Sequence, residues 1–207
     1  MKPFVRLQAC AIPYDASNVD TDQIVPARFL SRARQDGFGG QLFHDLRFGT
    51  DGTPNAAFIL HDPAFRDARI IVADENFGCG SSREVAVWAL MDYGIQAVIA
   101  ASFGEIFHSN SLKNGLLPVT LPAGVTRGLR NALLEGSYRH LDIDLHGQVV
   151  RTPDGEEHAF AIDPLRRQLL LQGTDEIQFT LEHKAELDAF EQDYDRDFPW
   201  LARPATG

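Results

Sequence analysis

Runs of apolar residues with few polar interruptions lie in the middle of the chain. Residues 68–74 (ARIIVAD), 97–102 (AVIAAS) and 116–121 (LLPVTL) are short and mostly β-branched or apolar, which predicts strands buried on both faces. Residues 82–93 and 103–113 separate these strands and have the length and pattern of helices. Strands that alternate with helices of about 10–12 residues predict a parallel α/β core.

Patterns of other kinds lie on either side of this core. Residues 4–14 mix β-branched, aromatic and apolar residues and indicate another strand. Residues 140–145 and 148–151, joined at His146-Gly147, predict a β-hairpin. The remaining expected elements are a short helix beginning at Pro26–Leu30, a helix at 126–135, strands at 157–162 and 176–181, a helix near 164–171 and an acidic amphipathic helix at 181–194.

The composition is that of an ordinary soluble globular protein. The 207 residues are 44% hydrophobic and 23% charged, which is enough to build one sizeable core. We therefore expect a single domain over residues 1–195, followed by a tail at 196–207. Within the domain, residues 31–55 are rich in Gly, Arg and Asp without a clear period, which predicts a long, mobile connection.

The charge of the chain excludes several classes of partner. A net charge of -10 and a pI near 5.1 argue against nucleic acid and anionic membrane surfaces, because both require a basic face. The sequence has no apolar run of about 18 residues and no signal-peptide pattern at its start, so we expect a cytoplasmic protein. A small anionic substrate is compatible with this charge, since one arginine at a helix start binds an anion locally.

The segment NFGCGSSREVAVWAL at residues 76–90 is the strongest candidate for chemistry. A dinucleotide-binding G-x-G-x-x-G pattern fails because Arg83 stands at the third glycine, and a nucleophile elbow fails because Glu84 stands at the last one. Cys10 and Cys79 are too few to hold an iron–sulfur cluster, which takes three or four thiolates. The histidines are scattered, so a zinc site is weak, and Cys79 is expected to be a small buried residue.

One physical interpretation of this segment remains. A glycine-rich turn that enters a helix presents backbone N–H groups, the hydroxyls of Ser81 and Ser82 and the Arg83 guanidinium to one place, which favours an anion such as a carboxylate. Each serine is either a helix cap or a reactive hydroxyl, and the residues alone leave the two roles open.

Three motifs in fixed order carry a resemblance to a known family. They are NVDTDQIVP at 18–26, NFGCGSSRE at 76–84 followed by Trp88-Ala-Leu, and residues 102–118, which contain Ser102-Phe, Ile106-Phe, Asn110 and Lys113-Asn-Gly-Leu-Leu-Pro. Over about residues 4–190 the chain resembles the small subunits of 3-isopropylmalate dehydratase, which are similar to the swivelling C-terminal domain of aconitase. The resemblance implies a three-layer β/β/α swivelling fold with a mostly parallel core sheet and a β-hairpin.

The resemblance also implies an activity and a partner. It implies a heterodimeric hydro-lyase of leucine biosynthesis that converts 2-isopropylmalate to 3-isopropylmalate by dehydration and rehydration. A separate large subunit would carry a 4Fe–4S cluster, and this chain would bind no metal or cofactor and would close over that cluster. This agrees with the shortage of cysteines.

Residue roles follow from the positions that match the family motifs. Ser81 matches the base that removes a proton next to a carboxylate, and Arg83 matches the residue that holds a substrate carboxylate. Asp22 matches an aspartate that assists proton handling, although a carboxylate in a polar loop is also typical of an Asx turn. Ser82 and Thr21 would contact the substrate. Arg32 and Arg34 lie in the 31–55 loop, which is thought to reach the variable group of the substrate.

The chain departs from the family pattern at three positions. Val85 stands where the family commonly has His, Val87 where many members have Pro, and Gln35 where the loop usually has Arg. Val85 is either an aliphatic core residue or a changed neighbour of Glu84. Two alternatives therefore stay open: a hydro-lyase subunit for another alkyl- or methyl-substituted malate or maleate, and a subunit that binds its partner without turnover.

Overall fold

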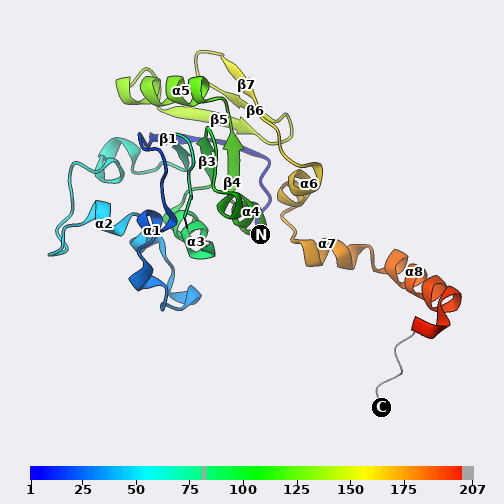
Figure 1. Ribbon diagram of the computed structural model, residues 1–207. Helices are drawn as coiled ribbons and strands as arrows, with labels where there is room; N and C mark the ends of the chain where they lie inside the picture. The colour runs from blue at the N-terminus through cyan, green and yellow to red at the C-terminus, as the bar shows by residue number, and fades with distance from the viewer. Residues whose placement is uncertain (81–82, 202–207) are drawn as a thin grey trace. The chain divides into compact units, whose positions relative to one another are not determined.

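A computed structural model describes residues 1–80 and 83–201 of the chain. The chain forms two compact units, Met1–Gly173 and a second unit that begins at Thr174. In the part of the first unit that is described, seven strands build one sheet in the order β4-β3-β2-β1-β5-β6-β7 (Figure 1). The strands are β1 (Arg6–Pro13), β2 (Ile70–Val72), β3 (Ala97–Ala100), β4 (Leu117–Thr120), β5 (His140–Asp144), β6 (Val149–Arg151) and β7 (Glu157–Ala159).

The sheet has a parallel half and an antiparallel half that meet at β1. Strands β1 to β4 pair in parallel, in chain order, and β5 pairs antiparallel with the other edge of β1. Strands β6 and β7 continue the antiparallel half. The mixed α/β class, the parallel core and the hairpin predicted from the sequence are confirmed. The antiparallel half is larger than a single hairpin, because β7 adds a third strand to it.

Helices cover both faces of the sheet. In Figure 1, α5 lies on one side of the sheet and α3 on the other. The helices of the first unit are α1 (Thr21–Ile24), α2 (His44–Arg47), α3 (Glu84–Tyr93), α4 (Glu105–Asn114), α5 (Ala123–Glu135) and α6 (Pro164–Gln172). Short 3-10 turns are η1 (Ala27–Phe29), η2 (Arg34–Asp36), η3 (Gly39–Gln41), η4 (Ile59–His61) and η5 (Pro63–Phe65).

Successive side chains of the central strands enter two different cores. Ile71 of β2 packs in a first core with the α3 residues Val87 and Leu90, whereas its neighbour Ile70 packs in a second core with Leu129 of α5. Adjacent strand residues point to opposite faces of a sheet, so strands covered on both sides must be apolar throughout. This explains the uninterrupted apolar runs of β2 and β3, in which every residue is buried.

The segment from 31 to 55 is anchored in the first core at its middle. Phe38, Leu42 and Phe43 are buried there, between the short turns η2, η3 and α2. Burial of each such side chain contributes roughly 1.5–3 kcal/mol. The mobility of the loop stays a prediction, and movement of its glycine-rich parts would have to pivot about these buried side chains.

The second unit contains α7 (Glu176–Glu182), α8 (Lys184–Asp197) and the turn η6 (Pro199–Leu201). The strand predicted at 176–181 is therefore wrong. Asp175 caps α7 by accepting a hydrogen bond from the Gln178 amide at 2.7 Å. Ile177 and Leu181 stand four residues apart, so they lie on one face of a helix. The same spacing is also compatible with the alternating pattern that predicted a strand. In the described part of the chain, no helix is both long and apolar enough to cross a membrane.

A buried arginine connects α5 to the end of β2. The Arg130 side chain is 4% exposed and donates hydrogen bonds of 2.9 Å to the Ala73 carbonyl and to the Asp74 carboxylate. Burial raises the pKa of Asp74, but the hydrogen bond and positive charge of Arg130 outweigh it, so the pKa is lowered overall. Residues 73–74 lead directly into the glycine-rich segment, and Arg130 therefore fixes its starting point.

Replacing Arg130 by Ala should destabilise the protein by about 3 kcal/mol at neutral pH, because a buried carbonyl and a carboxylate lose their donor. The lowered pKa of Asp74 means that this pair stabilises the fold above pH ~4 and stops doing so as the pH falls further. Urea unfolding at several pH values measures the free energy of unfolding. The difference in this free energy between wild type and variant should therefore become smaller in acid. Arg127→Ala, at an exposed position of the same helix, serves as the control and should change stability by less than about 0.5 kcal/mol.

Candidate active site

Three loops meet at one edge of the sheet. They follow the carboxyl ends of the neighbouring parallel strands β1, β2 and β3, and they contain the motifs at 18–26, 76–84 and 102–107. Parallel strands bring their carboxyl ends to the same edge, which is where open α/β sheets bind ligands. Motifs that lie far apart in the sequence therefore form one site.

Backbone hydrogen bonds join the first loop to the second. The Val19 carbonyl accepts from the amides of Gly78 at 2.8 Å and Cys79 at 3.1 Å. In return, the Thr21 amide donates to the Cys79 carbonyl at 2.9 Å. The two loops thus pair like short parallel strands, and this pairing fixes how far each extends from the sheet.

The second loop is joined to the third in the same way. The Phe77 amide donates to the Ser102 carbonyl at 3.0 Å, and the Gly104 amide donates to the Phe77 carbonyl at 2.9 Å. Asn76 connects all three loops, because its amide donates to the Ser102 hydroxyl at 2.8 Å and its side chain donates to the Asn18 side chain at 2.7 Å. The glycine-rich segment is therefore held on both sides.

Two glycines of this segment have no room for a side chain. Gly78 and Gly80 have φ angles of +74° and +85°, which L-residues with side chains rarely adopt. A Cβ atom on Gly78 would overlap the buried ring of Phe107, and one on Gly80 would overlap the carboxylate of Asp20. We predicted that these glycines form an anion-binding turn; in the structure, close packing between the loops requires them.

Asp22 and Arg83 form an ion pair at this edge. Asp22 is in α1, which Asp20 caps by accepting from the Asp22 amide at 2.6 Å, and Arg83 is the N-cap residue of α3. The side chains are 50% and 22% exposed, respectively. The structure thus brings together two of the residues predicted to act on the substrate, and it supplies a carboxylate to the guanidinium that was predicted to bind one.

Ser81 and Ser82 lie outside the described residues. Among the described residues, Gly80, Cys79 and Thr21 line a cavity of about 280 Å³. Thr21 is only 2% exposed, so it contributes to the wall of this cavity more than to its open side.

The cysteines are not arranged as a metal site. Cys79 is partly buried, and both burial and the negative charge of Asp20 raise the pKa of its thiol, which disfavours the thiolate that binds metals. Cys10 is buried in β1, where its Sγ lies 3.7 Å from the Ala64 carbonyl. Among the residues that the structure describes, no three His, Cys, Asp or Glu side chains are close enough together to hold a metal ion.

Arg34 is held at the other end of α3. It forms a two-pronged ion pair with Asp92, at 2.7 and 3.0 Å, and its guanidinium lies 5.1 Å from the Trp88 ring centroid. Asp92 also accepts from the Phe38 amide at 2.8 Å. A helix rises 1.5 Å per residue, so Asp92 and Arg83 are roughly 14 Å apart along the axis. Arg34 is therefore not part of the Asp22–Arg83 cluster within this chain.

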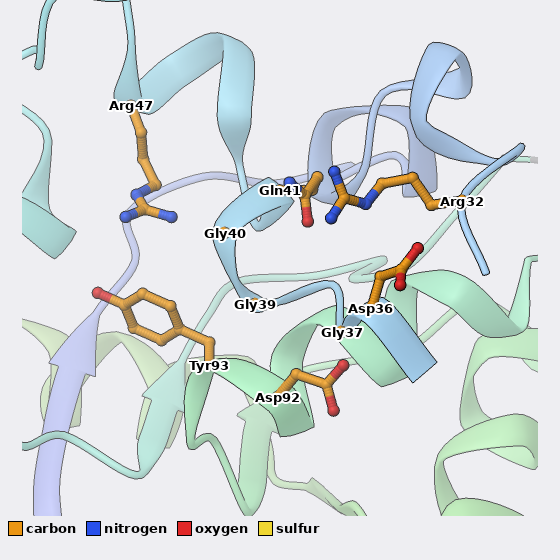
Figure 2. Close-up of a pocket in the computed structure, with 9 residues that line it drawn as sticks. All are labelled: Arg32, Asp36, Gly37, Gly39, Gly40, Gln41, Arg47, Asp92 and Tyr93. Atoms are coloured by element: carbon orange, nitrogen blue, oxygen red, sulfur yellow. The ribbon is translucent and has the colours of Figure 1, made fainter. Parts of the chain in front are cut away.

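Arg32 lines a second hollow, near the last turn of α3. Figure 2 shows Arg32 reaching toward Gln41, while the Arg47 guanidinium lies above the Tyr93 ring, 5.1 Å from its centroid. The hollow has a volume of about 510 Å³, and Gly37, Gly39 and Gly40 form part of its wall. Its acidic side chains, Asp36 and Asp92, balance its arginines, so the hollow is not strongly basic.

A side-chain network fixes the start of α3 to α4. Asn114 donates to the Glu84 carboxylate at 2.7 Å and accepts from the Trp88 indole N–H at 3.0 Å.

Val85 packs against the first core, in agreement with its interpretation as an aliphatic core residue. Three positions that build the site, Asp20, Asn76 and Asn114, were not predicted from the sequence. All three lie in the quoted motifs, and their type, short side chains that hydrogen-bond the backbone, was the available signal.

Comparisons with known proteins give the family. A family model described as the aconitase C-terminal domain matches residues 1–124, and a second one, LeuD_N, matches residues 131–164. Proteins called 3-isopropylmalate dehydratase small subunit are similar over nearly the whole chain. The protein from Gluconacetobacter diazotrophicus is 46% identical, with 98% of each chain covered, and that from Granulibacter bethesdensis is 47% identical, with 98% of this chain and 97% of the relative covered.

A solved structure agrees with these matches. The crystal structure of a 3-isopropylmalate dehydratase from Methanocaldococcus jannaschii superposes with a TM-score of 0.60 and 25% identity. The match covers 89% of this chain and 98% of that one. The predicted aconitase-like fold is therefore confirmed.

Replacement of Gly78 by Ala should destabilise the protein by about 2–4 kcal/mol, because the new methyl group meets Phe107 and the backbone angle is unfavourable. The matched control is Gly128→Ala in α5, where no atom lies within 4 Å of the new Cβ position. That change should stabilise the protein by about 0.5–1 kcal/mol. Urea unfolding curves measure the change in the free energy of unfolding for both variants. If the two changes have the same sign, the packing argument is contradicted.

Proposed function

The chain belongs to the 3-isopropylmalate dehydratase small subunits of the aconitase C-terminal domain family, and from this premise we propose that it supplies half of the active site of a two-subunit hydro-lyase. The reaction isomerises 2-isopropylmalate to 3-isopropylmalate, a step of leucine biosynthesis, by removing and re-adding water. The observation that carries this proposal is the Asp22–Arg83 pair, located where the three family motifs meet. Two free cysteines are compatible with the reducing cytoplasm as the place of action.

Arg83 is the residue that binds a carboxylate of the substrate. Its guanidinium is fixed at the N-cap of α3 and is already bonded to a carboxylate, that of Asp22. A substrate carboxylate of the same shape would take that position through a two-pronged contact. Half of the Asp22 side chain is exposed, so it has room to move aside and to receive or return a proton.

Ser81 is the residue that removes the proton. The carbon–hydrogen bond next to a carboxylate is a very weak acid, so the base must be strong, and a deprotonated serine has this strength. Such a group requires a nearby cation and hydrogen-bond donors, which Arg83 and the backbone of the glycine turn can supply. Ser82 would help to orient the substrate, whereas Thr21, which is 2% exposed, would act only as part of the cavity wall.

The other half of the site belongs to a large subunit. Cys10 and Cys79 cannot supply the three thiolates of a 4Fe–4S cluster, and Cys10 is buried in β1. The cluster is therefore assigned to the partner, where it would supply Lewis-acid chemistry at the substrate hydroxyl. This chain contributes the base, the carboxylate-binding arginine and a lid that excludes water.

The identity of the substrate is tested with the assembled complex. Purified complex should interconvert 2- and 3-isopropylmalate with a higher kcat/KM than it shows for methyl- or other alkyl-substituted malates and maleates. A different rank order would assign the chain to a sister hydro-lyase. Absence of turnover of every substrate by a complex with an intact cluster would favour a subunit that only binds its partner.

Replacing Ser81 by Ala should lower kcat by about 10²–10⁴-fold, the usual contribution of a general base. Gel filtration should show that the variant still assembles with the large subunit as wild type does. Ser137→Ala, at an exposed position after α5, is the control and should keep full activity. Full activity of the Ser81 variant would refute its role as the base.

Replacing Arg83 by Lys should lower kcat/KM by about 10–100-fold, mainly through a higher KM. Lysine keeps the positive charge but loses the planar fork that holds a carboxylate at two points. Steady-state kinetics at saturating large subunit measure the effect. An unchanged KM would mean that the substrate carboxylate is bound elsewhere.

A further inference from the structure

The second unit exposes a continuous row of large apolar side chains. Leu187, Phe190, Tyr194, Phe198 and Trp200 are between 41% and 73% exposed, and we call them the aromatic stripe. The first four stand three or four residues apart, which places them on one side of α8 and its end. The ring centroids follow one another at 5.9 Å (190 to 194), 4.9 Å (194 to 198) and 5.7 Å (198 to 200).

The second unit cannot bury this stripe in a core of its own. None of the residues of α7 and α8 is buried. A unit of fewer than about 40 residues rarely folds stably without a partner surface, a metal or disulfides. The stripe combines four aromatic rings and a leucine, and a contiguous exposed apolar patch on a soluble protein typically marks a binding surface.

The charges around the stripe restrict what can cover it. In α8 the cations Lys184 and Arg196 are already paired, the first with Asp188 and the second with Asp193 and Asp197. Glu186, Glu191 and Asp195 remain exposed on the same helix. This acidic border would repel an anionic membrane and a second copy of the same helix, and it complements an apolar groove bordered by Lys and Arg on another protein.

The relatives indicate which protein that is. Their matches span 200–203 residues of this chain, leaving at most seven of its 207 residues outside. Relatives that are called small subunits therefore retain the segment that contains α7 and α8. A segment present throughout these small subunits fits a partner that small subunits share, and the large subunit is that partner.

We infer that the aromatic stripe on α8 docks in an apolar groove with a basic border on the large subunit. This inference rests on the proposed function for the existence of the partner, but it concerns a surface separate from the motif loops. The stripe acts as an anchor, because side chains of this size lose little conformational freedom when buried and dominate interface affinity.

The test uses the full-length chain with the double substitution Leu187→Ala and Phe190→Ala, which preserves helix propensity. Isothermal titration against the purified large subunit should show a Kd at least 10-fold weaker than that of wild type. The control is Gln192→Ala, an exposed position on the opposite side of α8, and its Kd should be unchanged. Circular dichroism should show equal helix content in all three proteins.

Two further measurements separate the possible outcomes. The wild-type Kd should weaken as salt rises from roughly 50 to 300 mM, because the border is charged. A Kd of the double variant equal to that of wild type would overturn the inference, and so would a wild-type chain that self-associates through the stripe in sedimentation experiments. Turnover is assayed separately: a complex that binds through the stripe but converts no substrate would refute the proposed function alone.

Discussion

The pairing of residues 19–21 with 77–79 is the interaction on which the site depends. It is possible only because Gly78 has no side chain: a Cβ atom there would overlap the Phe107 ring, and a Cβ atom on Gly104 would in turn overlap the Gly78 carbonyl. With that contact, three loops from three parallel strands form one layer, and Arg83 emerges from it at the start of α3. A side chain at this point would separate the loops and move the guanidinium away from Asp22.

The role proposed for the Asp22–Arg83 pair would let an acidic protein bind an acidic substrate. The chain has a net charge of -10, so its average field repels a dicarboxylate. Under the proposed role of Arg83, binding of the substrate would come from one cation in a fixed and partly buried position. In the free chain, Asp22 neutralises this cation, which keeps a partly buried charge from standing alone.

The sequence revealed most of the fold, because the central strands are buried on both faces and read as uninterrupted apolar runs. It failed at 176–181, where alternating Ile177, Phe179 and Leu181 suggested a strand although Asp175 caps a helix. For the site, motif resemblance identified Asp22 and Arg83. It could not show that Arg34 pairs with Asp92, because that partner is 58 residues away and only the folded chain brings the two together. Asp20 was missed for a related reason, since its importance arises from contact with Gly80.

The two ends of helix α3 contact different parts of the molecule. Its first residue adjoins the pair proposed for the chemistry, whereas its last turn holds the loop that contains Arg32 and Arg34 through Asp92. A substitution in that loop therefore lies about one helix length from the Asp22–Arg83 pair. Under the proposed roles, a change there, such as Gln35, would alter the contact with the side group of the substrate and leave the carboxylate contact at Arg83 in place.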